Sequence, residues 1–143
     1  MKGILLAMFA GVLFACYQFA IKLSATHIQE IFGAVILQGV AVVVGLFLFL
    51  IVRDAETTLV YTKEGIRFAI IAGIFVSLAE IATFYAFAQD IRPSVGITLI
   101  VGFNILIGLC LDYFWIKSDL SWSQLLGILL VLIGVVLISW EKG

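Results

Sequence analysis

Residues 3–21, GILLAMFAGVLFACYQFAI, contain no Asp, Glu, Lys or Arg. A helix needs about 20 mostly apolar residues to cross the hydrocarbon core of a bilayer, so this run predicts a membrane-spanning helix. The stretches 31–52, 93–111 and 120–140 are also free of charge, and residues 68–89 contain one charged residue, Glu80. Such long runs do not alternate as barrel strands do. We therefore expect five transmembrane helices, over about residues 3–22, 30–52, 66–89, 93–115 and 120–140.

The composition also indicates a protein that lies in a lipid bilayer. The chain is 64% hydrophobic and 12% charged, with a mean hydropathy of +1.28, whereas soluble domains are about half apolar and a quarter charged. The net charge of −1 leaves no basic surface for nucleic acid. The first apolar run continues past Cys16 to Ile21, as in a retained helix, so we expect no cleaved signal peptide. These observations predict an all-α integral membrane protein, with residues 1–143 as a single five-helix domain.

Residues at the ends of the runs are typical of helix starts. Thr26 with Gln29, and Ser121 with Gln124, fit the spacing of a capping box, in which side chains satisfy the first free amides of a helix. Pro93 suits the first turn of the fourth helix, where its missing amide costs nothing. The connections are short apart from the one after residue 52, so consecutive helices are expected to be antiparallel neighbours.

The positive residues favour one orientation in the cytoplasmic (inner) membrane, because Lys and Arg tend to remain on the cytoplasmic side. The bias is weak and favours the N-terminus inside. It is also the bias of a chain that inserts in both orientations, so dual topology stays open. Five positive residues share the side of the N-terminus and three share the other: Lys2, Arg53, Lys63, Arg67 and Lys117 against Lys22, Arg92 and Lys142.

Small residues recur on helix faces, where they let two backbones approach closely in lipid. The first predicted helix has a small residue at every fourth position, the third repeats the pattern, and the fifth has two glycines one heptad apart. We interpret these positions as helix-packing surfaces. They are Gly3, Ala7, Gly11 and Ala15, then Ala69, Gly73 and Ser77, and finally Gly127 and Gly134.

The presence of Glu80 within a predicted span needs an explanation. An ionisable side chain at the bilayer centre costs at least about 2.5 to 3.5 kcal/mol on insertion scales. Glu80 lies roughly 3 Å from the middle of its predicted span at the helical rise. The small-residue face of that helix points Glu80 into protein rather than lipid. We interpret Glu80 as a proton carrier or a site for a cationic substrate. The alternative is a protonated or hydrogen-bonded carboxyl that ties helices together.

Other polar residues within the spans are candidates for the same substrate site. Gln18, Gln38 and Asn104 are predicted at depths that allow them to converge with Glu80, while Tyr17 and Tyr85 add hydroxyls, unless these bond only to neighbouring backbone. Lys22 closes the first run, and its default role is to anchor that helix at the interface, with a role as internal counter-ion as the second choice. The sequence shows no catalytic triad, phosphate loop or metal-ligand cluster. We therefore predict no enzyme, no metal and no cofactor.

Several motifs resemble the drug/metabolite transporter superfamily, specifically its EamA-type five-helix repeat. The most specific match is the last helix, residues 120–127 (LSWSQLLG) and 128–135 (ILLVLIGV). Tyr17 and Gln18 followed by Lys22 are similar to the end of the family's first helix, and residues 84–86 (FYA) to the end of its third. The family often has a Glu before the last helix and a Pro within the fourth, where this chain has residues 117–119 (KSD) and 102–104 (GFN).

The resemblance implies that the five helices are one half of an inverted-repeat, ten-helix transporter, which works by alternating access around a site near the membrane midplane. It also implies a partner: a second copy of this chain, inserted antiparallel, or a paired homologue. The function expected is a secondary transporter subunit for a small organic solute, an amphipathic cation or metabolite, with proton coupling through Glu80. The alternative is a non-transporting subunit that packs against a larger membrane partner.

Overall fold

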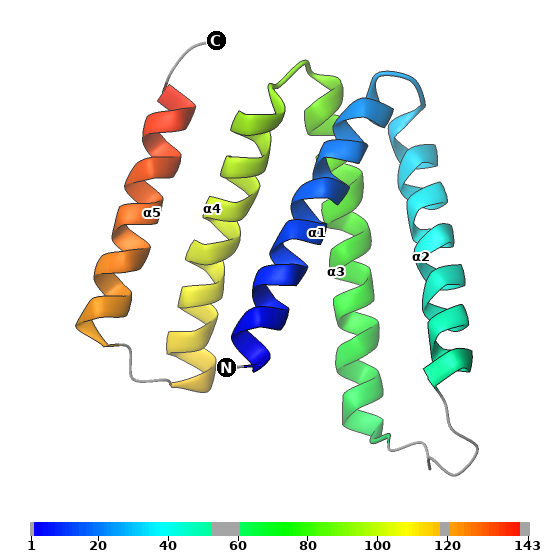
Figure 1. The fold of residues 1–143 in the computed structure, drawn as a ribbon, viewed down its shortest axis with the longest axis horizontal. Helices are drawn as coiled ribbons and strands as arrows, with labels where there is room; N and C mark the ends of the chain where they lie inside the picture. Colours follow the sequence, from blue (N-terminus) through cyan, green and yellow to red (C-terminus); the bar gives the residue numbers. More distant parts are fainter. Residues whose placement is uncertain (1, 53–60, 118–120, 141–143) are drawn as a thin grey trace. The chain divides into compact units, whose positions relative to one another are not determined.

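The fold is all-helical in the residues that the computed structural model describes, 2–52, 61–117 and 121–140. Figure 1 labels the helices and colours them along the chain, from blue at the N-terminus to red at the C-terminus. They are α1 (Lys2–Ala25), α2 (Glu30–Val52), α3 (Lys63–Ala88), α4 (Pro93–Leu111) with a π-helical turn η1 (Asp112–Ile116), and α5 (Trp122–Trp140). The predicted all-α class and the five predicted helices are thus confirmed for these residues.

Among the residues that the structure describes, four helical segments are long and apolar enough to cross a membrane, judged by length and composition: α1, α2, α3 and the continuous stretch Pro93–Ile116. The apolar part of α5, Trp122–Ile138, is shorter. It is close to the lower limit of about 17 residues for a spanning helix. The crossing of the membrane by α5 therefore stays a prediction.

The helix ends follow local hydrogen bonding. The predicted capping box of α5 is confirmed, because the Gln124 amide donates to Ser121 Oγ at 3.4 Å and the Ser121 amide to Gln124 Oε1 at 2.9 Å. Pro93 occupies the first turn of α4, as predicted. The α3 helix starts before the predicted residue 66, because Thr62 caps it: Thr62 Oγ1 accepts from the Gly65 amide at 3.0 Å.

The capping box predicted at Thr26 is wrong. Helix α1 continues to Ala25 rather than ending near Lys22, and the Thr26 hydroxyl donates to the Leu23 carbonyl at 3.4 Å. It therefore satisfies the end of α1 and not the start of α2, which begins at Glu30. The fourth helix, predicted to end near residue 115, ends at Ile116 of η1, after which Lys117 adopts a left-handed backbone conformation (φ 55°, ψ 38°). Such a residue stops a right-handed helix.

The chain divides into two compact units, which we describe separately. Residues Ala20–Gln89 form the α2–α3 unit, which includes the end of α1. Residues Met1–Phe19 and Asp90–Gly143 form the α4–α5 unit. Within each unit the two helices of its name pack against each other. The single five-helix domain predicted from the sequence stays a prediction.

Close packing of α4 against α5 depends on a glycine outside the predicted small-residue surfaces. Gly102 is buried in α4. A Cβ added there would lie 2.8 Å from both Cγ1 and Cγ2 of Val135, which is too close for real atoms. The lack of a side chain at Gly102 therefore lets the two backbones approach.

No other part of the described residues packs against the glycines of the predicted small-residue surfaces. An added Cβ meets no atom within 4 Å, its own helix backbone apart, at Gly3, Gly11, Gly73, Gly127 and Gly134. Ala7, Ala15 and Ala69 are exposed, whereas Ser77 is half-buried. Their role in helix packing stays a prediction for surfaces that the described residues leave open.

We expect Gly102→Ala to lower the free energy of unfolding by about 1–3 kcal/mol, the usual cost of overpacking. The matched control is Gly108→Ala in the same helix, where an added Cβ meets no atom within 4 Å. That control should be neutral or slightly stabilising, since Ala favours a helix over Gly by roughly 0.5–1 kcal/mol. Thermal unfolding of the purified protein in detergent measures both, and equal effects of the two substitutions would contradict this account of α4–α5 packing.

Candidate functional site

Glu80 lies on α3 and is buried, with 8% of its surface exposed. It shares a helix face with Gly73, Ser77, Phe84 and Phe87, because residues three, four and seven apart in a helix lie on one side. Phe84 and Phe87 are fully buried at 2% and 0% exposure. From Ser77 to Phe87 this face of α3 packs into the protein, as the sequence predicted for Glu80, whereas Gly73 is exposed.

Two neutral polar side chains join Glu80 in a hydrogen-bonded chain between α2 and α3. Gln38 Nε2 on α2 donates to Glu80 Oε2 at 3.0 Å. Ser77 Oγ lies 2.9 Å from Gln38 Oε1 and 2.8 Å from the Gly73 carbonyl oxygen. The serine hydroxyl has one hydrogen for these two acceptors, so it shares or alternates its bond. We call Gln38, Ser77 and Glu80 the polar cluster.

The composition of the polar cluster decides what it can do. Glu80 is its one ionisable member, and the Gln38 amide, which accepts a hydrogen bond from Ser77, orients the carboxyl. A buried carboxylate held in this way attracts a proton or a ligand cation. The same hydrogen bonds also tie α2 to α3, since interhelical hydrogen bonds in membranes contribute about 0.6 kcal/mol on average and up to about 2 kcal/mol. The cluster is thus suited to both readings of Glu80 that the sequence left open.

Gln18 and Tyr17 lie in the α4–α5 unit. Gln18 is 8% exposed, and its Oε1 atom is buried without a hydrogen-bond partner among the described residues. A buried carbonyl oxygen without a donor is costly and is satisfied when a ligand or water supplies one. Tyr17 is half-buried, with its ring edge-on to Phe14 at a centroid distance of 6.0 Å. Gln18 therefore has the chemistry of a binding residue.

The other two predicted site residues are more exposed. Tyr85 lies on α3 with 44% of its surface exposed, and Asn104 is exposed on α4 in the other unit. The structure thus brings Gln38 to Glu80 within the α2–α3 unit. It does not bring Tyr85 into the polar cluster, and the convergence of Gln18, Tyr17 and Asn104 on Glu80 stays a prediction.

Lys22 has a role that sequence reasoning missed. Its Nζ donates to the Phe87 carbonyl oxygen at 2.9 Å, across 65 residues of chain. Phe87 is in the last turn of α3, which ends at Ala88, and carbonyls there have no amide partner within the helix. A lysine at the end of an apolar run gives no sign of which carbonyl it meets, so no sequence signal identifies this contact.

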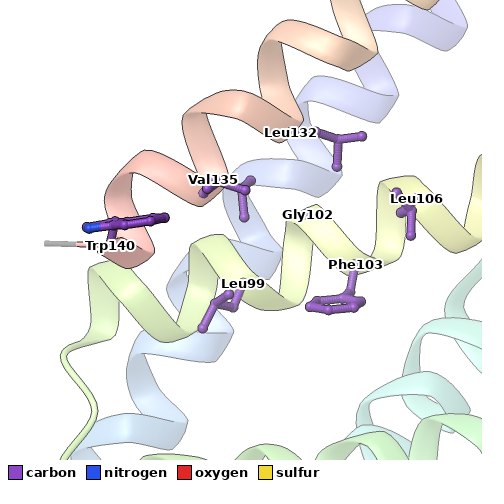
Figure 2. Close-up of a pocket in the computed structure, with 8 residues that line it drawn as sticks. Leu99, Gly102, Phe103, Leu106, Leu132, Val135 and Trp140 are labelled. Carbon is purple, nitrogen blue, oxygen red and sulfur yellow. The ribbon is translucent and has the colours of Figure 1, made fainter. Parts of the chain in front are cut away.

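An apolar cavity of about 430 Å³ lies between α4 and α5. Figure 2 shows Gly102 and Leu106 of α4 opposite Val135 and Leu132 of α5, with Trp140 at the end of α5. Such a cavity accepts an apolar group such as an acyl chain or a hydrocarbon ring. None of the predicted substrate-binding residues lines it, because its residues are indistinguishable in sequence from lipid-facing ones: Leu99, Gly102, Phe103, Leu106, Leu132, Val135, Val136 and Trp140.

We expect Gln38 and Glu80 to be energetically coupled. In a double-mutant cycle of Gln38→Met and Glu80→Met, the coupling free energy should be about 0.5–3 kcal/mol, the range for residues in contact. The control pairs Gln38→Met with Thr62→Ala, which removes the α3 cap about 27 Å along the helix from Glu80 at the helical rise. That pair should be additive within roughly 0.5 kcal/mol. Chemical unfolding in detergent measures both cycles, and an additive Gln38–Glu80 pair would show that their hydrogen bond contributes nothing to stability.

Comparison with known proteins agrees with the resemblance seen in the sequence. Residues 1–140 match the profile of the EamA-like transporter family. Searches of curated proteins and of solved structures gave no significant match. Because the family match extends over nearly all of the 143 residues, it includes both compact units, the polar cluster and the apolar cavity. The chain therefore belongs to the EamA-like transporter family.

Proposed function

We propose that this protein is a secondary transporter subunit that moves a small organic solute, an amphipathic cation or metabolite, by alternating access. Glu80 binds a proton and the solute in turn. The observation that carries the proposal is the buried Glu80 carboxyl, 8% exposed and held by the neutral amide of Gln38 at 3.0 Å. An ionisable side chain inside an apolar bundle is expensive, so its presence favours a role in transport.

The solute class follows from the polarity of the candidate residues. The polar cluster offers a carboxyl, and Gln18 Oε1 is an acceptor without a donor among the described residues. Acceptors of this kind suit a solute that carries a positive charge or N–H and O–H groups. The largely apolar helices around them suit hydrocarbon portions of the solute, which supports an amphipathic cation or metabolite over an inorganic ion.

The working unit in this proposal is a dimer with ten helices. In inverted-repeat transporters the substrate lies at the interface of two halves of opposite orientation. Two copies of a five-helix chain reproduce that arrangement when they insert antiparallel in the cytoplasmic membrane. The weak excess of positive residues on the N-terminal side supports insertion in both orientations. Each copy then contributes one polar cluster.

We expect Glu80→Gln to reduce substrate-driven proton flux into liposomes at least about tenfold, since a proton-transfer residue contributes on the order of 10²-fold or more. The amide keeps the size of the side chain and its ability to hydrogen-bond with Gln38, but it does not take up a proton. Glu80→Asp should retain part of the flux. The matched control is Glu64→Gln, an exposed carboxyl in the first turn of α3, which should behave as the parent. Unchanged flux in Glu80→Gln would exclude proton coupling through this residue.

A second prediction concerns orientation. In whole cells that express the chain with a C-terminal tag, an impermeant label should reach about half of the tags from the outside, the fraction for equal insertion in both orientations. Permeabilised cells give the total, and a fixed-orientation membrane protein with the same tag is the control. Labelling of all or none of the tags from outside would rule out the antiparallel homodimer. Stoichiometric co-purification of a homologue would favour a paired heterodimer, and of an unrelated membrane protein a non-transporting subunit.

A further inference from the structure

The buried residues of the α2–α3 unit gather at one end. That end contains the last turns of α1, the first turns of α2 and the last turns of α3, and its large buried side chains are Ile21, Phe84 and Phe87, at 2%, 2% and 0% exposure. Ala25 and Ala34 are buried there as well, at 6% and 3%. We call Ile21, Phe84 and Phe87 the end cluster. It closes this end of the unit with packed hydrocarbon.

The rest of α2 and α3 is exposed. Every residue of 39–52 and of 63–76 is exposed. Glu80 lies at the border between the two regions, one helical turn before Phe84 and about 10 Å along the helix from Phe87 at the helical rise. In this conformation the end cluster therefore separates the Glu80 carboxyl from one end of the unit, while the residues of α2 and α3 beyond Glu80 in the other direction are exposed.

The start of α2 fits closely against the end cluster. A Cβ added at Gly33 would lie 2.6 Å from Phe84 Cε1 and 2.9 Å from Ile28 Cδ1. Real atoms do not approach that closely, so the Phe84 ring packs directly against the backbone at Gly33. There is no spare room at this point for a solute or for water.

Lys22 fastens α1 to the same end. Its ammonium donates to the Phe87 carbonyl oxygen at 2.9 Å, one residue after Ile21 enters the end cluster. The positive charge also complements the partial negative charge at the C-terminus of α3. A lysine has a long flexible stem and is half-buried here. The Lys22 ammonium can therefore leave the Phe87 carbonyl oxygen and bind water or a lipid headgroup instead, so that its charge is not left in hydrocarbon.

We propose that Lys22 is a gate residue: its hydrogen bond to the Phe87 carbonyl holds the end cluster shut, and breaking that bond opens a path to Glu80 from this end. The inference rests on the proposed function, because a gate matters only if a solute passes Glu80. It adds a positioning residue that acts through α3, distinct from the polar cluster that binds. Alternating access then requires Lys22 to release Phe87 once in each cycle.

The test measures how fast water-soluble maleimide reaches a buried position at this end. In a background with Cys16→Ser and Cys110→Ser, a single cysteine is introduced by Ala34→Cys, and labelling is followed in lipid nanodiscs, where both membrane faces are reachable. We expect Lys22→Met to raise the labelling rate at least tenfold, since its apolar stem cannot donate to the carbonyl. Lys22→Arg should restore slow labelling, because guanidinium still donates. Lys63→Met, an exposed lysine at the start of α3, is the matched control and should leave the rate unchanged.

A second pair of variants tests the end cluster without changing charge. Gly33→Ala should displace Phe84 and raise the labelling rate, whereas Gly39→Ala in the same helix, where an added Cβ meets no atom within 4 Å, should not. Should Lys22→Met fail to fold, Lys22→Gln, too short to span to the carbonyl, replaces it with the same expectation. Equal labelling rates in the parent and the Lys22 variants, or fast labelling in Lys22→Arg, would overturn the proposal. The labelling needs no solute, so a failed gate and a failed transport assay remain separate results.

Discussion

Helices in hydrocarbon do not associate through the hydrophobic effect, because lipid tails are as apolar as the side chains they would replace. Every contact between the helices therefore depends on polar groups that need a partner or on backbones that approach closely. The α2–α3 unit uses both devices, with the Gln38–Glu80 and Lys22–Phe87 hydrogen bonds and the close approach of Phe84 to the backbone at Gly33. The α4–α5 unit uses the second, with Gly102 against Val135.

These two devices give the units different properties. A hydrogen bond between side chains breaks and reforms with changes of charge or hydration, so the α2–α3 unit has contacts that respond to a proton or a cation. Glycine packing has no such dependence, and the α4–α5 unit presents an apolar cavity lined by hydrocarbon.

The helices and the central carboxyl were predictable from the sequence because each depends on local pattern. Long charge-free runs located the five helices, and a single acid on a small-residue face predicted that Glu80 points inward. Gln38 was among the polar candidates because its predicted depth allows it to meet Glu80. The fold beyond that depends on contacts between distant residues. Lys22 resembled an interfacial anchor because nothing near it in sequence identifies Phe87, and Gly102 lies outside the small-residue surfaces that the sequence predicts.

Helix ends were the least predictable feature, since one hydroxyl decides them. Thr62 extends α3 by capping it, while Thr26, in an equally suitable sequence, turns back to α1. For the small-residue surfaces of α1 and α3, the pattern was predictable but the packing partner was not. Their spacing was clear, but spacing does not say which surface covers them. The apolar cavity was invisible for a related reason, because a cavity wall and a lipid-facing surface have the same composition.

The distance along the chain between Gln38 and Glu80 has a consequence for biosynthesis. Gln38 and Glu80 are 42 residues apart, and membrane helices are made and inserted in chain order. The amide of α2 is therefore already within the bilayer when the carboxyl of α3 arrives. A helix that carries an acid is a poor substrate for insertion by itself, but here it enters beside a helix that offers a hydrogen-bond donor at the matching depth. The order of the helices along the chain thus eases the delivery of a costly residue into lipid.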